Sequence, residues 1–191
     1  MDRIYAPWRI EWVERESDPI DGCPFCVLPE REDDRESRIV ARSERNYVLL
    51  NNAPYNPGHA MVIPNEHRED PTDLDDAVLF DHAKLKAATL AALRRDVDPD
   101  GVNTGQNLGA SAAGGSVDHL HTHVVPRWDG DTNFMPVTGG TKVIVEAIDR
   151  TYEHLHAGFA AGDDVVDPGD AEAGEAVELE FDVWSGSDDP L

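Results

Sequence analysis

Short apolar segments separated by turn residues mark the first part of the chain. Residues 39–41 and 47–51 have strand character and flank a polar turn at 43–46, which predicts a β-hairpin. The turn-rich segment 52–58 then leads into the apolar run 60–63, which a proline ends. The pattern therefore predicts three strands that follow one another closely.

Two later stretches carry apolar residues at helical spacing. Thr72 is a suitable N-cap for the first, which has acidic residues in its opening turns, two arginines at its far end and a predicted end near Asp96. The apolar positions of this helix are Val78, Leu79, Leu85, Leu90 and Leu93. Those of the second predicted helix are Ile144, Ile148, Tyr152, Leu155 and Phe159.

Further strands are predicted on both sides of the second helix. Residues 102–108 and 120–125 have strand character. Near the C-terminus, residues 177–184 alternate apolar and acidic side chains, which predicts a half-buried strand on this chain's sheet or on a partner's. The rest of the tail from Gly162 has no basic residue and is rich in Asp, Glu, Gly and Ala, so we expect it to be mobile.

Length and charge narrow the class of protein. A chain of 191 residues favours one domain with extensions, here an arm over 1–22, a folded domain over 23–160 and an acidic tail over 161–191. The formal charge of -23 would repel nucleic acid and anionic membranes. Acidic residues are spread along the chain and lysines are few, which favours halophilic adaptation; the alternative is an acidic interaction surface.

Targeting signals are not apparent in the sequence. No stretch approaches the roughly 18 apolar residues of a membrane span. The first residues, Met-Asp-Arg-Ile-Tyr-Ala-Pro-Trp, lack the apolar core of a signal peptide. We therefore expect a cytoplasmic protein.

Three histidines stand at every second position of a β-prone run. On a strand, His119, His121 and His123 would share one face, roughly 6.5–7 Å apart. A Gly-Gly-Ser turn precedes them. Because imidazole suits acid–base, nucleophilic and ligand chemistry near neutral pH, the row predicts a functional site rather than three structural histidines.

The only cysteines form the motif Cys-Pro-Phe-Cys. Cys23 and Cys26 could be a redox pair, half of a zinc site or two buried thiols. A disulfide is disfavoured in the cytoplasm, and a thioredoxin-like role would require a βαβ context that the pattern lacks. Zinc is the strongest option, and it would require two further ligands.

With these motifs in view, the chain resembles the histidine triad (HIT) superfamily. Its signature, His-φ-His-φ-His-φ-φ with φ apolar, matches from His119 onward, and Thr122 is the one departure. Within the superfamily it is most similar to the diadenosine tetraphosphate phosphorylase-like branch. That similarity covers about residues 1–160 and rests on Ala-Pro-Trp-Arg at 6–9, the cysteine motif, Pro-Tyr-Asn-Pro-Gly-His at 54–59, Ala-Gly-Gly-Ser at 113–116 and Gly-Asp-Thr-Asn-Phe at 130–134.

The resemblance implies a fold and an activity. The fold would be α+β, an antiparallel sheet with two principal helices, usually in a homodimer. The activity would be nucleotidyl transfer or hydrolysis on dinucleoside polyphosphates, with His121 as the nucleophile that forms a covalent nucleotidyl-histidine. The alternative is a nucleotide-binding HIT module with weak or vestigial catalysis.

His121 would need one protonated ring nitrogen, held by a carbonyl or similar acceptor, and one free lone pair. His123 is placed to contact phosphate or assist proton transfer, with His59 as support. Asn51 matches the ribose-binding position, although Asn52 could take that role and either residue could simply form the turn. Further candidate contacts to phosphate, among them the backbone and hydroxyl of the Gly-Gly-Ser turn, are Asn107, Gly114, Gly115, Ser116 and Arg127.

Metal ligands also follow from the resemblance. HIT proteins with this cysteine pair take a histidine after the Gly-His strand and the first triad histidine, here His67 and His119, to complete a closed structural zinc site with Cys23 and Cys26. The competing assignment has all three triad histidines around a catalytic metal. Mg²⁺ could accompany the polyphosphate substrate.

Overall fold

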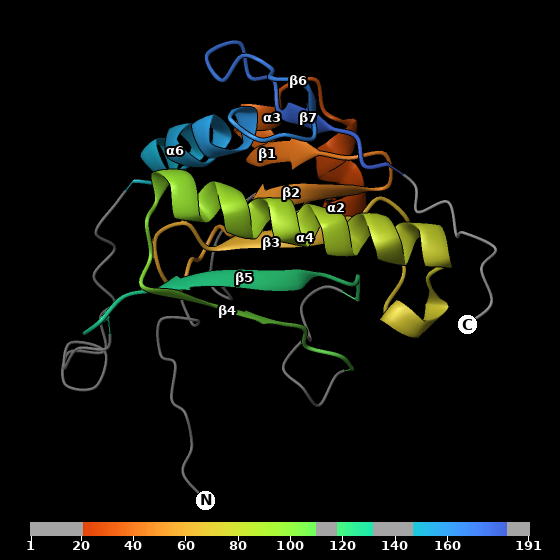
Figure 1. The fold of residues 1–191 in the computed structure, drawn as a ribbon. Helices are drawn as coiled ribbons and strands as arrows, with labels where there is room; N and C mark the ends of the chain where they lie inside the picture. Colours follow the sequence, from red (N-terminus) through yellow and green to blue (C-terminus); the bar gives the residue numbers. More distant parts are fainter. Residues whose placement is uncertain (1–20, 110–117, 132–146, 183–191) are drawn as a thin grey trace, which may run out of the picture.

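The structure, a computed structural model, describes residues 21–109, 118–131 and 147–182. In this part of the chain seven strands form one sheet in the order β4-β5-β3-β2-β1-β7-β6 (Figure 1). All neighbours pair antiparallel except β1 and β7, which are parallel. The strands are β1 Ile39–Arg42, β2 Asn46–Leu50, β3 Ala60–Pro64, β4 Gly101–Gly105, β5 Thr122–Arg127, β6 Val165–Asp167 and β7 Val177–Leu179.

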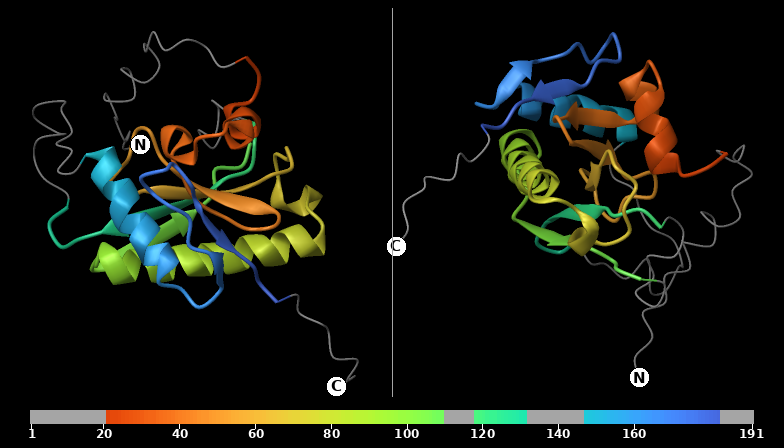
Figure 2. Two further views of the ribbon diagram at one scale, coloured as in Figure 1. Left: turned by 90° about the horizontal axis from the view of Figure 1, so that it is seen from above. Right: turned by 90° about the vertical axis from the view of Figure 1, so that its right-hand side faces the viewer.

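Helices cover both faces of this sheet. The long helix α4 (Asp76–Asp96) and α6 (Ile148–Ala160) pack on one face, and short α2 (Pro24–Val27) lies on the opposite side from α4 (Figure 2). The other helical turns in the described residues are η1 (Leu28–Glu30), α3 (Asp34–Ser37) and η2 (Pro71–Asp73). The α+β class expected from the resemblance is confirmed.

Alternation along the strands explains the two layers of core. Val48 and Val62 face α4 and α6, where they meet Leu85 and Phe159. Their odd-numbered neighbours in the sheet point the other way, into a smaller cluster around Phe25 of α2. β2 is therefore buried along its whole length, and the two apolar faces fix its register.

Most predicted elements are present, with corrected boundaries. β1 and β2 form the predicted hairpin, β3 occupies the predicted apolar run, and α4 ends at Asp96. Thr72 is not the N-cap of α4: Asp70 binds the Thr72 amide and hydroxyl in a separate turn, and Asp75 caps the helix by accepting from the Val78 amide. In α6, the predicted apolar positions from Ile148 onward are helical. Position 144 lies outside the described residues.

The histidine row is only partly on a strand. β5 begins at Thr122, so His123 belongs to it whereas His119 and His121 precede it. That preceding segment is tied to the turn after β3, because the Leu120 amide donates to the Arg68 carbonyl at 2.6 Å. The predicted strand at 102–108 is likewise shorter and ends at Gly105.

The acidic tail is held against the domain over residues 162–182, contrary to the expected mobility. β7 pairs with β1, and the buried side chains of Val177 and Leu179 extend the helix-side core. Arg35 donates to the Ala171 carbonyl at 3.0 Å.

Within the described ranges no helix is long and apolar enough to cross a membrane. The N-terminal arm up to residue 20 and the end of the predicted tail strand lie outside the described residues.

Candidate functional site

The two cysteines and two histidines converge behind α2. One ligand atom from each of Cys23, Cys26, His67 and His119 lies within 4.8 Å of the others. Sulfur-to-Nδ1 distances are 3.4 Å for Cys23 to His119, 3.4 Å for Cys26 to His67 and 3.6 Å for Cys26 to His119. A tetrahedral zinc with bonds of about 2.0–2.3 Å would set its ligands about 3.3–3.8 Å apart, so the donor set and these three distances fit zinc.

Local structure explains this convergence. Cys23 caps α2, and its carbonyl accepts from the Cys26 amide, which brings both sulfurs to one end of the helix. The Nε2 atom of His119 donates to the Pro64 carbonyl at 3.0 Å, which leaves Nδ1 as the free lone pair facing the sulfurs. Burial lowers the pKa of His119 to about 4, so its ring is neutral, as a metal ligand must be.

His121 has its tautomer fixed by the backbone. Its Nδ1 atom lies 2.8 Å from the His119 carbonyl, to which it can only donate. The neutral ring therefore carries its lone pair on Nε2. The Phe25 ring packs edge-on at 5.3 Å between centroids and restricts the imidazole. This carbonyl is the acceptor that the sequence led us to expect.

The tautomer of His123 is also fixed, and it is the opposite of that of His121. The Tyr55 amide donates to His59 Nδ1 at 3.1 Å, so His59 carries its proton on Nε2. That proton points to His123 Nδ1, 3.0 Å away, and the His123 proton is then on Nε2. The amide nitrogen of Asn107, 3.5 Å from this Nε2, is itself a donor and does not bond to it in this tautomer. The rings of His121 and His123 are 4.9 Å apart. Two neighbouring rings therefore supply a nitrogen lone pair, on His121, and an N–H donor, on His123.

Asn51 follows β2 and shapes the turn that leads to His59. Its side-chain oxygen accepts from the Ala53 amide at 2.8 Å, and its amide nitrogen lies 3.4 Å from the Met61 sulfur. The turn-forming role considered from the sequence is therefore present. Gly58 lies in this turn with a φ of 79°, which residues with a side chain rarely adopt. An added Cβ would also lie only 3.0 Å from Pro126 Cγ, so the position favours glycine.

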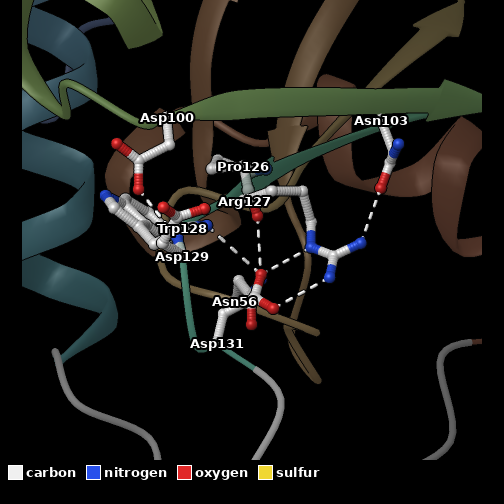
Figure 3. Close-up of polar contacts among 8 residues, drawn as sticks. All are labelled: Asn56, Asp100, Asn103, Pro126, Arg127, Trp128, Asp129 and Asp131. Atoms are coloured by element: carbon white, nitrogen blue, oxygen red, sulfur yellow. Dashed lines mark hydrogen bonds and ion pairs between the residues drawn. The ribbon is translucent and has the colours of Figure 1, made fainter.

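Arg127 is placed away from the histidines. It lies four residues beyond His123 on β5, about 13 Å along the strand. Its guanidinium binds both carboxylate oxygens of Asp131 and, at 2.8 Å, Asn103 of β4 (Figure 3). The cation is thus paired within the fold, and its expected direct contact with substrate stays a prediction.

Asp131 is the centre of this contact group, which sequence reasoning missed. Besides Arg127, it accepts from Asn56 of the turn before His59 at 2.9 Å and from the Trp128 amide (Figure 3). The second amide proton of Asn56 goes to the Pro126 carbonyl at 2.8 Å. The hydrogen bonds from Arg127 hold the pKa of Asp131 well below its ordinary value. The group thus fastens the turn to the end of β5.

Two parts of the predicted site have different outcomes. Asn107 is brought to His123, with its amide nitrogen 3.5 Å from Nε2. Gly114, Gly115 and Ser116 lie outside the described residues. The sequence pattern also did not predict a chain of buried polar residues behind the triad. Its signal was Thr122, which departs from the apolar pattern of the motif.

Comparisons with known proteins identify relatives of this chain. A HIT domain family model matches residues 32–130, just over half of the chain. The AP-4-A phosphorylase of Mycobacterium tuberculosis is 40% identical over 170 residues, which cover 84% of this chain and 85% of that protein. The Protein hit of Bacillus subtilis is 34% identical over 116 residues, covering 60% and 77%.

Solved structures show the same fold. A zinc-bound histidine triad family protein from Mycobacterium smegmatis superposes with a TM-score of 0.59 at 26% identity, covering 73% of this chain and 94% of that one. A hypothetical histidine triad nucleotide-binding protein from Sulfolobus tokodaii gives 0.55 at 29% identity, covering 72% and 89%. The chain belongs to the HIT family.

Proposed function

We propose that this protein transfers a nucleotidyl group from a dinucleoside polyphosphate, with diadenosine tetraphosphate as the substrate, through a covalent bond to His121. The observation that carries the proposal is the fixed tautomer of His121, whose lone pair is on Nε2 and whose ring centroid lies 4.9 Å from that of His123, the ring protonated on Nε2. The similarity to an AP-4-A phosphorylase supports the choice of substrate.

The reaction would proceed in two balanced steps. First, His121 Nε2 attacks the α-phosphorus, an N–P bond forms, and the bond to the bridging oxygen breaks so that ATP leaves. Second, an oxygen of inorganic phosphate attacks the same phosphorus, the N–P bond breaks, and ADP is released. Water in place of phosphate would give AMP. In both steps the backbone acceptor at the His119 carbonyl keeps the Nδ1 proton of His121 in place.

His123 would serve as the donor to the phosphate. Its Nε2–H, maintained by the proton that His59 donates to Nδ1, is positioned to bind a phosphate oxygen whose charge develops in the transition state. The amide of Asn107 would bind on the same side. Gly114, Gly115 and Ser116 would add donors, and Asn51 would contact ribose.

Cys23, Cys26, His67 and His119 would hold one structural zinc ion. Bound there, zinc would link α2 to the segment that carries His121 and supply stability rather than a reacting group. We also propose a homodimer, and Mg²⁺ that arrives with the polyphosphate.

Product analysis tests the proposal. Incubation with diadenosine tetraphosphate and phosphate should give ADP plus ATP, and incubation without phosphate should give AMP plus ATP or no turnover. His121→Ala should abolish turnover, whereas the control His154→Ala, which removes a histidine from α6 on the other face of the sheet, should retain it. Unchanged turnover in His121→Ala would contradict the proposal, and tight nucleotide binding without turnover in the wild type would favour a binding module.

A further inference from the structure

A continuous chain of polar side chains crosses the core behind the histidines. It runs from Gln106, after β4, through Thr122 of β5, His82 of α4 and Asn46 of β2 to Asp81 of α4. All of these except Gln106 are buried, with exposures of 0% for Asn46 and 7% or less for the others. The proposed reaction uses none of them.

Each link of this chain is a short hydrogen bond. Gln106 Nε2 lies 2.8 Å from Thr122 Oγ1, which lies 2.7 Å from His82 Nε2. His82 Nδ1 is 2.8 Å from Asn46 Oδ1, and Asn46 Nδ2 is 2.6 Å from Asp81 Oδ2. Buried polar groups of this kind are costly unless every member is satisfied, so the chain is under strong constraint.

The carboxylate of Asp81 sets the direction of every link. It accepts from the Asn46 amide nitrogen, which also faces the Val78 carbonyl, so the Asn46 oxygen must point at His82. His82 therefore carries its proton on Nδ1, and its Nε2 accepts from the Thr122 hydroxyl. The Thr122 oxygen is then open to the Gln106 amide. Burial, which lowers the pKa of His82 to about 4, keeps this ring neutral.

The Gln106 end of the chain reaches the reacting groups through two of its members. Thr122 stands between His121 and His123, with its side chain buried on the α4 side of the strand. Gln106 immediately precedes Asn107, whose amide lies 3.5 Å from His123 Nε2. An apolar residue, which the HIT signature has at the Thr122 position, could make neither of these two hydrogen bonds.

We propose that Thr122 and His82 are positioning residues. They anchor two segments to α4, residues 119–123 with the triad and residues 106–107 after β4, so that His121 and His123 converge on one phosphate. The inference rests on the proposed function for its kinetic consequence, but its structural consequence can be measured without turnover. Their effect passes through the histidines, and neither residue contacts substrate.

The kinetic test compares three threonine variants. Thr122→Val keeps the shape of the side chain but removes both hydrogen bonds, and we expect kcat to fall about tenfold with KM nearly unchanged, since misplaced reacting groups act on the transition state. Thr122→Ser restores the hydroxyl and should recover most of kcat. Thr89→Val is the matched control, because it removes an equally buried hydroxyl of α4 that bonds only the Leu85 carbonyl among the contacts described.

Imidazole ¹⁵N NMR of the same proteins separates positioning from general damage. In the wild type, His82 should show a neutral ring protonated at Nδ1. Thr122→Val should shift the His121 and His123 signals, Thr122→Ser should restore them, and Thr89→Val should leave them in place. Gln106→Met, at the exposed end of the chain, should shift the His123 signal alone and covers the case in which Thr122→Val does not fold.

Two results would overturn the inference: unchanged imidazole signals in both Thr122→Val and Gln106→Met, or a loss in Thr122→Val that Thr122→Ser does not recover. A wild type that lacks turnover would contradict the proposed function instead. The NMR comparison would still decide the positioning role in that case.

Discussion

At the scale of single residues, the site depends on which ring nitrogen carries a proton. The spacing of the three histidines predicts a shared site, but it cannot predict their tautomers. Those follow from partners distant in sequence: the His119 carbonyl for His121, and His59 for His123. The second partnership exists because β3 and β5 pair with Met61 opposite His123. Register of this kind is not visible in local sequence.

Protonation of His82 predicts a pH dependence of stability. Its pKa falls from 6.5 to about 4 on folding, so between these values the unfolded chain binds the proton that the folded chain excludes. Stability from this group is therefore complete above pH 6.5 and is lost as pH falls towards 4, by about 3 kcal/mol in total. Urea unfolding of the wild type and His82→Phe at fixed salt should show their difference in stability shrinking by this amount. A difference independent of pH would contradict the buried neutral ring.

At the scale of elements, turns and helix ends are set by competing caps. Thr72 is a good N-cap by type, yet Asp70 engages it in its own turn and Asp75 starts α4. Propensity alone does not decide between such neighbours. Similarly, an arginine beside the triad suggests a phosphate contact, but Arg127 is paired with Asp131, which lies in a segment with no strand or helix pattern.

The contacts of Asp131 predict a role in substrate binding through the turn. Asp131→Ala should release Asn56 and Arg127, loosen the turn that carries Asn51 and His59, and lower kcat/KM about tenfold. Steady-state kinetics checks this prediction. Asp129→Ala removes a carboxylate two positions away and serves as the control; equal effects of the two variants would show that the loss is one of local charge.

The link between α2 and the triad segment predicts a zinc requirement. Purified protein should contain one zinc per chain, which Cys23→Ser loses and His121→Ala retains, because the ligand atoms of His119 and the cysteines converge without His121. Elemental analysis gives the stoichiometry, and chelation should lower the melting temperature before it lowers activity. Zinc lost in His121→Ala and retained in Cys23→Ser would favour the catalytic-metal assignment instead.

At the scale of the whole molecule, the sequence pattern predicted the succession of strands and helices but not how distant segments pair. The alternation at the C-terminus predicted a strand, yet its partner, β1, lies more than a hundred residues earlier and pairs in parallel. The resemblance to the HIT superfamily supplied the architecture of the triad and metal residues. It had no counterpart for the tail strands, which lie beyond the matched residues 32–130.

Charge predicts how the folded state responds to salt. With a formal charge of -23, self-repulsion should destabilise the fold at low ionic strength. At 1 M salt the Debye length is about 3 Å, so this repulsion is screened. The melting temperature should therefore rise from low to molar KCl. A melting temperature that falls over this range would count against halophilic adaptation.

The proposed reaction depends on a bond between His121 Nε2 and phosphorus. Stoichiometric enzyme mixed briefly with diadenosine tetraphosphate in the absence of phosphate, quenched in alkali because phosphoramidates are labile to acid, can be analysed by peptide mass spectrometry. We expect one adenylyl group on His121, discharged as ADP when phosphate is added before the quench, and none in His121→Ala. An adenylyl group on another residue, or turnover by the wild type with no covalent adduct at any time point, would contradict it.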